Sequence, residues 1–217
     1  MSIRVRYEKE LRGVFDNLVL MCRYIEVAIE KSIKALTDLD YELAREVCEE
    51  DQLIDKMERD IEQSCLKILV MEHPLASDFR EVSAALKMIT DLERIGDQAH
   101  DIAEITTKLG EDGGSKLVNI PRMAAIVVQM VKDGVQAYIN RDLVLARSLE
   151  KTDDKVDDLF RVIRSDLTAL IRRDPDSAER AIMLMMVAKY LERIGDHAIN
   201  IGEWVEYAIT GSHPKKE

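Results

Sequence analysis

The sequence predicts an all-α protein built as two tandem antiparallel three-helix bundles, and three observations support this prediction. Proline (4), glycine (9) and aromatic residues (5%) are scarce among the 217 residues, a composition typical of long helices. Apolar residues recur at helical spacing over long stretches of the chain. The second half of the chain also repeats the first half, so one helical unit is written twice.

The internal repeat is clearest in two segments of 14 residues, "DLERIGDQAHDIAE" (91–104) and "YLERIGDHAINIGE" (190–203), which agree at 9 positions. Closer to the N-terminus a weaker match at an offset of 102 residues pairs Asp40 with Asp142. At the stronger match the offset is 99, as expected if one loop of the second copy is shorter. The chain is therefore interpreted as a tandem duplication.

The first repeat, residues 1–109, is predicted to contain three helices. Apolar residues at helical spacing place the first helix at 5–37. Asp40 is expected to cap the second helix, and Ser77 the third, because both residue types are preferred at the N-cap. Pro74 separates these two helices, since proline is not tolerated in a helix interior.

A linker is predicted at 110–121, "GEDGGSKLVNIP", because it contains three glycines and a closing proline. The second repeat, 122–210, should then form three further helices, at 122–140, 143–173 and 175–210. Asp174 is expected to cap the last of these helices, because the following Pro175 is well tolerated at the first helical position. Residues 211–217 are expected to form a short disordered tail.

The charge balance and the cysteines restrict the class of protein. A net charge of -11 disfavours general nucleic-acid binding, which needs a basic surface. The three cysteines, Cys22, Cys48 and Cys65, are far apart and are expected to be reduced core thiols. No signal peptide and no apolar run of membrane-spanning length is found. A cytoplasmic protein is therefore expected.

Acidic residues lie four apart on the predicted third helix of each repeat, and the second helices carry matching pairs. Antiparallel packing of neighbouring helices would bring these like charges together, which is unfavourable unless cations intervene. Hard metal ions with oxygen ligands would relieve the repulsion. The predicted metal ligands are Asp51, Asp55, Glu93 and Asp97 in the first repeat, and Asp153, Asp157, Glu192 and Asp196 in the second.

Two readings of this pattern remain open from the residues alone. An acidic stripe opposite an apolar one is also what a simple solvated helix face looks like. Gly96 and Gly195 lie between the acids, and an interior helix glycine costs about 1 kcal/mol relative to alanine. Their retention in both copies indicates either close helix packing or room for metal ligands. His100 and His197 are not kept across the repeat and are disfavoured as ligands.

No catalytic residues are predicted. The sequence has no P-loop, no HExxH and no GxSxG motif. A ferritin-like di-iron site needs two Glu-x-x-His motifs, and only Asp97-x-x-His100 comes near this pattern. Three classes stay open: a metal-binding signalling adaptor that is not an enzyme, a carboxylate-bound metal store or metal-dependent enzyme, and a purely structural helical module.

The motif "LERIGDxA", found on the last helix of each repeat, resembles the signature of the PhoU family, and the likeness extends over the whole chain. The E(D)xxxD motifs of that family correspond to Glu93 with Asp97 and Glu192 with Asp196. The resemblance implies a cytoplasmic, usually dimeric protein that binds multinuclear metal clusters on its surface, iron among them, and has no catalytic role.

The same resemblance implies a regulator of phosphate uptake and phosphate-starvation signalling. Its partners would be the phosphate-specific ABC transporter and a membrane sensor histidine kinase, so that it reaches the membrane only through them. The two repeats differ near the acids: Phe160 and Arg164 replace Glu58 and Glu62, and Asn200 replaces Asp101. The first site is therefore expected to be richer in oxygen ligands, and the two sites to differ in nuclearity or affinity.

Overall fold

The structure, a computed structural model, describes residues 3–71, 74–109 and 119–214. These residues form helices and connecting turns, with no β-strand among them. The elements are α1 (Ile3–Asp38), α2 (Tyr41–Met71), α3 (Ala76–Lys108), α4 (Asn119–Asn140), α5 (Leu143–Arg173), one turn of 3-10 helix η2 (Pro175–Ser177) and α6 (Ala178–Thr210). The predicted all-α fold of two three-helix bundles is confirmed.

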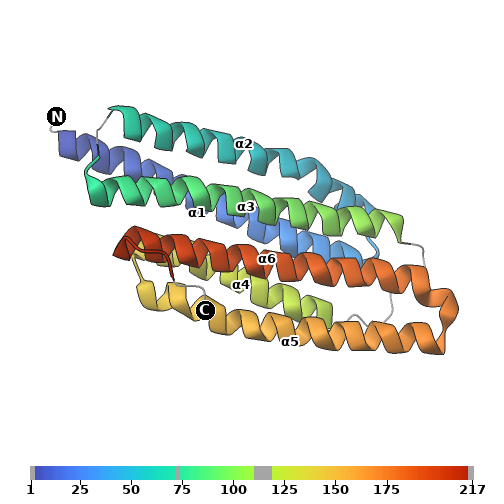
Figure 1. Cartoon of the computed structure of the whole chain (residues 1–217). Coiled ribbons are helices and arrows are strands. Elements are labelled where there is room, and N and C mark those ends of the chain that lie inside the picture. The colour runs from blue at the N-terminus through green and yellow to red at the C-terminus, as the bar shows by residue number, and fades with distance from the viewer. Residues whose placement is uncertain (1–2, 72–73, 110–118, 215–217) are drawn as a thin grey trace.

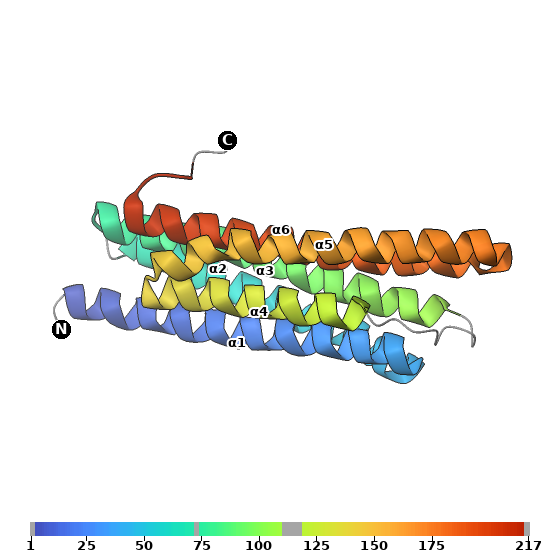
Figure 2. The ribbon, with the colours of Figure 1, turned by 90° about the horizontal axis from the view of Figure 1, so that it is seen from below.

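The two bundles pack against each other through four of the six helices. α3 and α6 lie side by side and antiparallel at the centre of Figure 1, and α1 packs beside α4 behind them. Figure 2, seen from below, shows α1 and α4 next to each other. α2 packs on α1 and α3 at one edge, and α5 packs on α4 and α6 at the other. The two repeats are thus arranged as an approximate twofold pair.

One continuous hydrophobic core runs through both repeats. Leu92 and Ile95 of α3 are fully buried, and so are Leu191 and Ile194 at the equivalent positions of α6. Residues of all six helices belong to the same buried cluster. Because both repeats bury their apolar faces in this shared core, the folding of one repeat should depend on the other.

The α1–α2 and α4–α5 turns are built in the same way. Leu39 and Arg141 both adopt the left-handed conformation, with φ of 54°, at the position where a helix most often ends in glycine. The following aspartates cap the next helix, since Asp40 accepts from Leu43 N at 3.0 Å and Asp142 from Leu145 N at 2.9 Å. The predicted cap at Asp40 is confirmed, and the repeat preserves it.

The predicted caps of the third helices are wrong. α3 begins after Leu75, and no side chain caps it, so Ser77 lies inside its first turn. Asp78 in that turn instead accepts from Arg4 Nη1 of α1 at 2.6 Å. In the second repeat the Asp174 side chain makes no cap, because a turn of 3-10 helix separates it from α6.

The α4 helix starts earlier than predicted and includes part of the expected linker. It begins at Asn119, with Pro121 in its first turn, where a missing N–H is tolerated. The rest of the linker, 110–118, lies outside the described residues. At the other end, α6 stops at Gly211, and His213 stacks on the Tyr207 ring at 4.5 Å. Residues 215–217 of the expected tail lie outside the described residues.

Candidate metal centres

The first carboxylate cluster, defined as Asp51, Asp55, Glu93 and Asp97, lies where α2 packs on α3. Oxygen atoms of Asp51, Asp55 and Asp97 lie within 4.8 Å of one another. All three side chains are half-buried, and Glu93 is half-buried as well. The structure therefore brings acids of two helices together at this site, as the four-residue spacing predicts.

Burial, and to a lesser extent the neighbouring carboxylates, raise pKa values in and beside the first cluster. Burial raises the pKa of Asp51, and the charges of Asp55 and Asp97 raise it further. Burial, followed by the Asp97 charge, raises the pKa of Glu93. Burial also raises the pKa of Glu58, one turn further along α2. These shifts mean that the carboxylates resist ionising together, so a bound cation would be favourable.

The second carboxylate cluster, defined as Asp153, Asp157, Glu192 and Asp196, lies where α5 packs on α6. Burial raises the pKa of Asp153 to about 6, and the charges of Asp157, Asp196 and Glu192 contribute. Burial, then the Glu192 charge, raises the pKa of Asp196. Asp157 and Asp196 are exposed, whereas their counterparts in the first cluster are half-buried. The second cluster is thus the more open of the two.

Gly96 and Gly195 make room for the acids of the neighbouring helix. A Cβ atom on Gly96 would lie 3.6 Å from Asp51 Oδ1 and 3.1 Å from the Ile54 side chain. A Cβ atom on Gly195 would lie only 2.7 Å from Asp153 Oδ1. The helices therefore approach closely at both glycines, with the Ile54 side chain nearest to Gly96 and the Asp153 carboxylate nearest to Gly195. Room for metal ligands stays a prediction. These positions and the all-oxygen donor set fit a hard metal ion.

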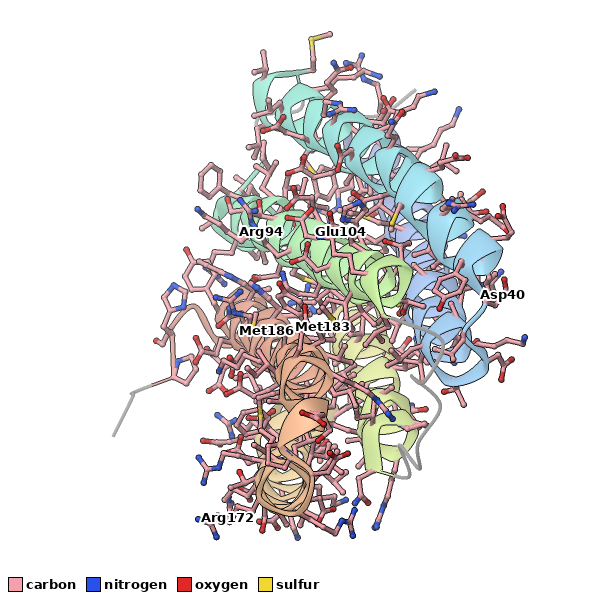
Figure 3. All side chains as sticks on the ribbon, turned by 90° about the vertical axis from the view of Figure 1, so that its right-hand side faces the viewer. Asp40, Arg94, Glu104, Arg172, Met183 and Met186 are labelled. Atoms are coloured by element: carbon pink, nitrogen blue, oxygen red, sulfur yellow. The ribbon has the colours of Figure 1, made fainter. Side chains whose placement is uncertain are left out.

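Basic side chains lie beside both clusters, but at different positions of the repeat. Arg94 Nη1 lies 3.0 Å from Asp97 Oδ2, and its Nε 3.5 Å from Glu93 Oε2. Figure 3 shows Arg94 on the outer side of α3. The equivalent of Arg94 is Arg193, but the second cluster is contacted by Lys189, whose Nζ pairs with Glu192. The sequence analysis did not single out Lys189, since the first repeat has Thr90 there.

A polar contact joins α3 and α6 and was not predicted from the sequence. Asp91 Oδ1 lies 2.9 Å from His197 Nδ1 and accepts from Asn200 Nδ2 at 3.1 Å. Asp91 is two residues from Glu93, and His197 follows Asp196. All three residues occupy positions at which the two "LERIGD" segments differ. These differences could have pointed to the contact, because residues that pair across two helices need not be identical in the two copies.

The cysteines and His100 take no part in the closest carboxylate group. All three cysteines are free thiols; Cys22 and Cys65 are buried, as predicted, and Cys48 is half-buried. Burial, with the nearby charge of Glu104, raises the pKa of Cys48, which keeps it protonated. His100 Nδ1 lies 3.8 Å from Asp101 Oδ1, beside the first cluster. Within the described ranges, no helix is both long enough and apolar enough to cross a membrane.

The chain matches the model of the PhoU domain twice, at residues 18–106 and 120–205. Two similar proteins are phosphate-specific transport system accessory protein PhoU homologs. The one from Aquifex aeolicus is 37% identical over 85% of this chain and 84% of its own length. The one from Pseudomonas aeruginosa is 34% identical over 97% of this chain and 88% of its own length.

Solved structures agree with this match. The crystal structure of PhoU from Pseudomonas aeruginosa has a TM-score of 0.89 at 34% identity and covers 95% of this chain and 100% of that chain. A phosphate transport system regulatory protein PhoU from Streptococcus pneumoniae, at 23% identity, has a TM-score of 0.90 over 97% of this chain and 100% of that one and shares the fold. With two family domains that correspond to its two three-helix repeats, the chain belongs to the PhoU family.

Proposed function

We propose that the protein is an accessory regulator of phosphate uptake and phosphate-starvation signalling. It acts by contact with the phosphate-specific ABC transporter and with the cytoplasmic part of a membrane sensor histidine kinase. Membership of the PhoU family supports this role, and so do the names of its relatives, which are accessory proteins of a phosphate-specific transport system. The protein is cytoplasmic, forms a homodimer and reaches the membrane only through these partners.

The regulator binds multinuclear metal clusters, with iron as one candidate ion, at the two carboxylate clusters. The observation that carries this part is the convergence of acids around a glycine in both repeats, with the pKa of Asp51 and Asp153 raised above the ordinary value. Asp51, Asp55, Glu93 and Asp97 would hold the first metal cluster, and Asp153, Asp157, Glu192 and Asp196 the second. A bound cation would supply positive charge that removes the repulsion and fastens α2 to α3 and α5 to α6.

The protein does not act as an enzyme. Its carboxylates lie along the outer edges of two helix pairs, and neither a serine nor a cysteine is paired with a base among the described residues. The alternative is a metal store or metal-dependent enzyme, which requires turnover or large metal uptake. Oxygen consumption after addition of Fe²⁺ separates the two: the regulator should give no catalytic consumption, and sustained consumption would favour the alternative.

The metal-binding part is tested by elemental analysis of protein purified without chelator. The double variant Asp97→Ala, Asp196→Ala should lose most of the bound metal. The matched control is Asp60→Ala, Asp166→Ala, which removes one exposed acid from each of α2 and α5 outside the clusters. Equal metal content in the wild type and in the cluster variant would remove metal binding from the proposal.

The partner part is tested by pull-down with the nucleotide-binding subunit of the transporter and with the cytoplasmic region of the kinase. We expect specific capture of each by the wild-type protein. A helical protein of the same size and net charge serves as the control for non-specific binding. Capture of neither partner would contradict a regulator that acts by direct contact.

A further inference from the structure

Two of the charge differences between the repeats lie beside Glu192 of the second cluster. On the outer helix, α5 has Phe160 where α2 has Glu58. On the inner helix, α6 has Lys189 where α3 has Thr90. At these two positions the second repeat loses one carboxylate and gains one ammonium group. Both changes make the surroundings of Glu192 less negative than those of Glu93, although the four predicted ligand positions of each repeat are acidic.

Lys189 is held in place by two contacts. Its Nζ pairs with the Glu192 carboxylate one turn along α6. The same ammonium lies 5.8 Å from the centre of the Phe160 ring, at a distance where a cation is attracted to an aromatic face. Phe160 is half-buried against the core, so the ring position is fixed by packing. The two substitutions thus act together, because the ring that replaces Glu58 also supports the lysine.

Arg94 is the basic residue beside the first cluster, and it is the more exposed of the two basic side chains. Its side chain is 57% exposed, against 43% for Lys189, and it contacts Glu93 and Asp97 of its own helix, as Lys189 contacts Glu192. The close group of Asp51, Asp55 and Asp97 oxygens forms despite this contact. No group of three such donors is found at the second cluster within the part of the chain that the structure describes. The first cluster is therefore arranged for a cation, whereas a protein ammonium occupies the edge of the second.

We propose that Lys189 is a resident counter-cation of the second cluster, which competes with metal ions for Glu192 and makes this cluster the weaker of two metal sites. This inference rests on the proposed metal binding and adds the order in which the two clusters fill with metal. The first cluster fills at low metal concentration, and the second fills only when metal displaces the ammonium. The protein then has three loading states, and the metal concentration selects among them.

The test is a titration of chelator-treated protein with Mn²⁺ alone, followed by the electron paramagnetic resonance signal of free Mn²⁺. Mn²⁺ is a hard ion that prefers carboxylate ligands. The wild type should show a tight and a weak class of sites. Asp97→Asn should remove the tight class, and Asp196→Asn the weak class, which assigns each class to its cluster.

Reciprocal variants then test the lysine itself. Lys189→Thr should tighten the weak class by about tenfold, because it removes one positive charge a few ångströms from the ion in a partly solvated site. Thr90→Lys should weaken the tight class in the same way. Lys189→Arg keeps the charge and should bind like the wild type. Lys34→Thr removes an exposed lysine that pairs with Asp38 on α1 and should change neither class.

The outcomes separate this inference from the proposed function. Equal affinity of the two clusters in the wild type, or an unchanged weak class in Lys189→Thr, overturns the role of Lys189 while metal binding stands. A wild type that binds no Mn²⁺, or cluster variants that bind as much as the wild type, overturns both. Circular dichroism on each variant checks the fold, and Thr90→Lys provides an independent arm should Lys189→Thr not fold.

Discussion

The α2–α3 pair and the α5–α6 pair hold acids at the same four positions, but their surroundings differ. Half-buried carboxylates with a nearby arginine surround the first glycine, whereas two of the four acids at the second glycine are exposed and one pairs with a lysine. The comparison shows that both repeats kept the four acids after the duplication, while several neighbouring side chains diverged.

The outer surfaces of the two repeats also differ, because exposed apolar residues of the first repeat correspond to polar residues in the second. Leu20 and Val27 of α1 are 45% and 44% exposed. The equivalent residues of α4 are Arg122 and Gln129, which are also exposed. Leu53 of α2, 46% exposed, corresponds to Lys155 of α5. The fold accepts polar residues at all three positions, so the exposed apolar side chains of the first repeat are not needed for folding.

The largest expected effect tests whether the two repeats are independent. Leu92→Ala and Leu191→Ala remove equivalent, fully buried side chains, and each should destabilise the protein by about 2–5 kcal/mol. Because the core is continuous, each variant should lower the midpoint of one common urea transition followed by circular dichroism. Two separate transitions, with only one shifted in each variant, would show that the repeats fold alone.

A smaller effect is expected where the third helices approach the second helices. A Cβ atom on Gly202 would lie 3.0 Å from the Ala146 carbonyl oxygen of α5, so Gly202→Ala should cost about 1–3 kcal/mol through overpacking. The first repeat has Ala103 at this position, and Ala103→Gly should cost about 1 kcal/mol through helix propensity. Urea unfolding of both variants measures the difference. A stabilised Gly202→Ala protein would mean that α5 and α6 can move apart.

The polar contacts between α3 and α6 should contribute less to the free energy of unfolding. Asp91→Ala removes the acceptor of Asn200 and the partner of His197, at a cost of about 1–2 kcal/mol. Tyr190 occupies the equivalent position and bonds to Asp101, and Tyr190→Phe should cost less than about 1 kcal/mol at this more solvated position. Thermal unfolding ranks the two variants. The reverse ranking would place the main polar link on the Tyr190 side.

The smallest expected effect is a pH dependence that differs between the clusters. The pKa of Asp153 is about 6 in the folded protein, above the ordinary value of 3.8. The fold therefore favours the protonated form, so the free energy of unfolding should fall as pH rises from about 4 through 6 and then level off.

Asp153→Asn should remove this part of the slope, worth less than about 1 kcal/mol after screening by solvent. The variant should also raise the Tm of the metal-free protein at pH 7.5 more than at pH 5. Differential scanning fluorimetry in the presence of chelator measures both, with Asp166→Asn as a matched control on α5. If stability depended on pH in the same way in the wild type and in Asp153→Asn, the pH dependence could not be assigned to Asp153.

The acids that converge could be predicted because each step from sequence to site is local. A spacing of four puts Glu93 and Asp97 on one helix face, and a short connection makes the second and third helices antiparallel neighbours. The caps at Ser77 and Asp174 failed for a different reason. Asp78 finds its partner in Arg4, a residue 74 positions away, and the 3-10 turn before α6 has no counterpart in the helix pattern.

The packing of one repeat on the other could not be derived from the sequence. Periodicity identifies an apolar face but not which of several apolar faces meet across the centre. The methionine-rich start of α6 illustrates this limit. Its apolar residues do not all face the core, since Ile182 and Met186 are 60% and 41% exposed, and Figure 3 shows Met183 and Met186 where α6 borders α3. Lys189 escaped attention because its role depends on Phe160 of another helix.

The antiparallel contact of α3 with α6 joins two similar halves within one chain, whereas a homodimer must bring two such halves together from separate chains. Subunits of a homodimer carry every substitution twice and separate on dilution. Here both halves are covalently joined, so the contact persists at any concentration, and a change in one half leaves the other untouched. Ancestral symmetry can therefore be lost one side at a time, so the two carboxylate clusters can diverge from each other within a single gene product.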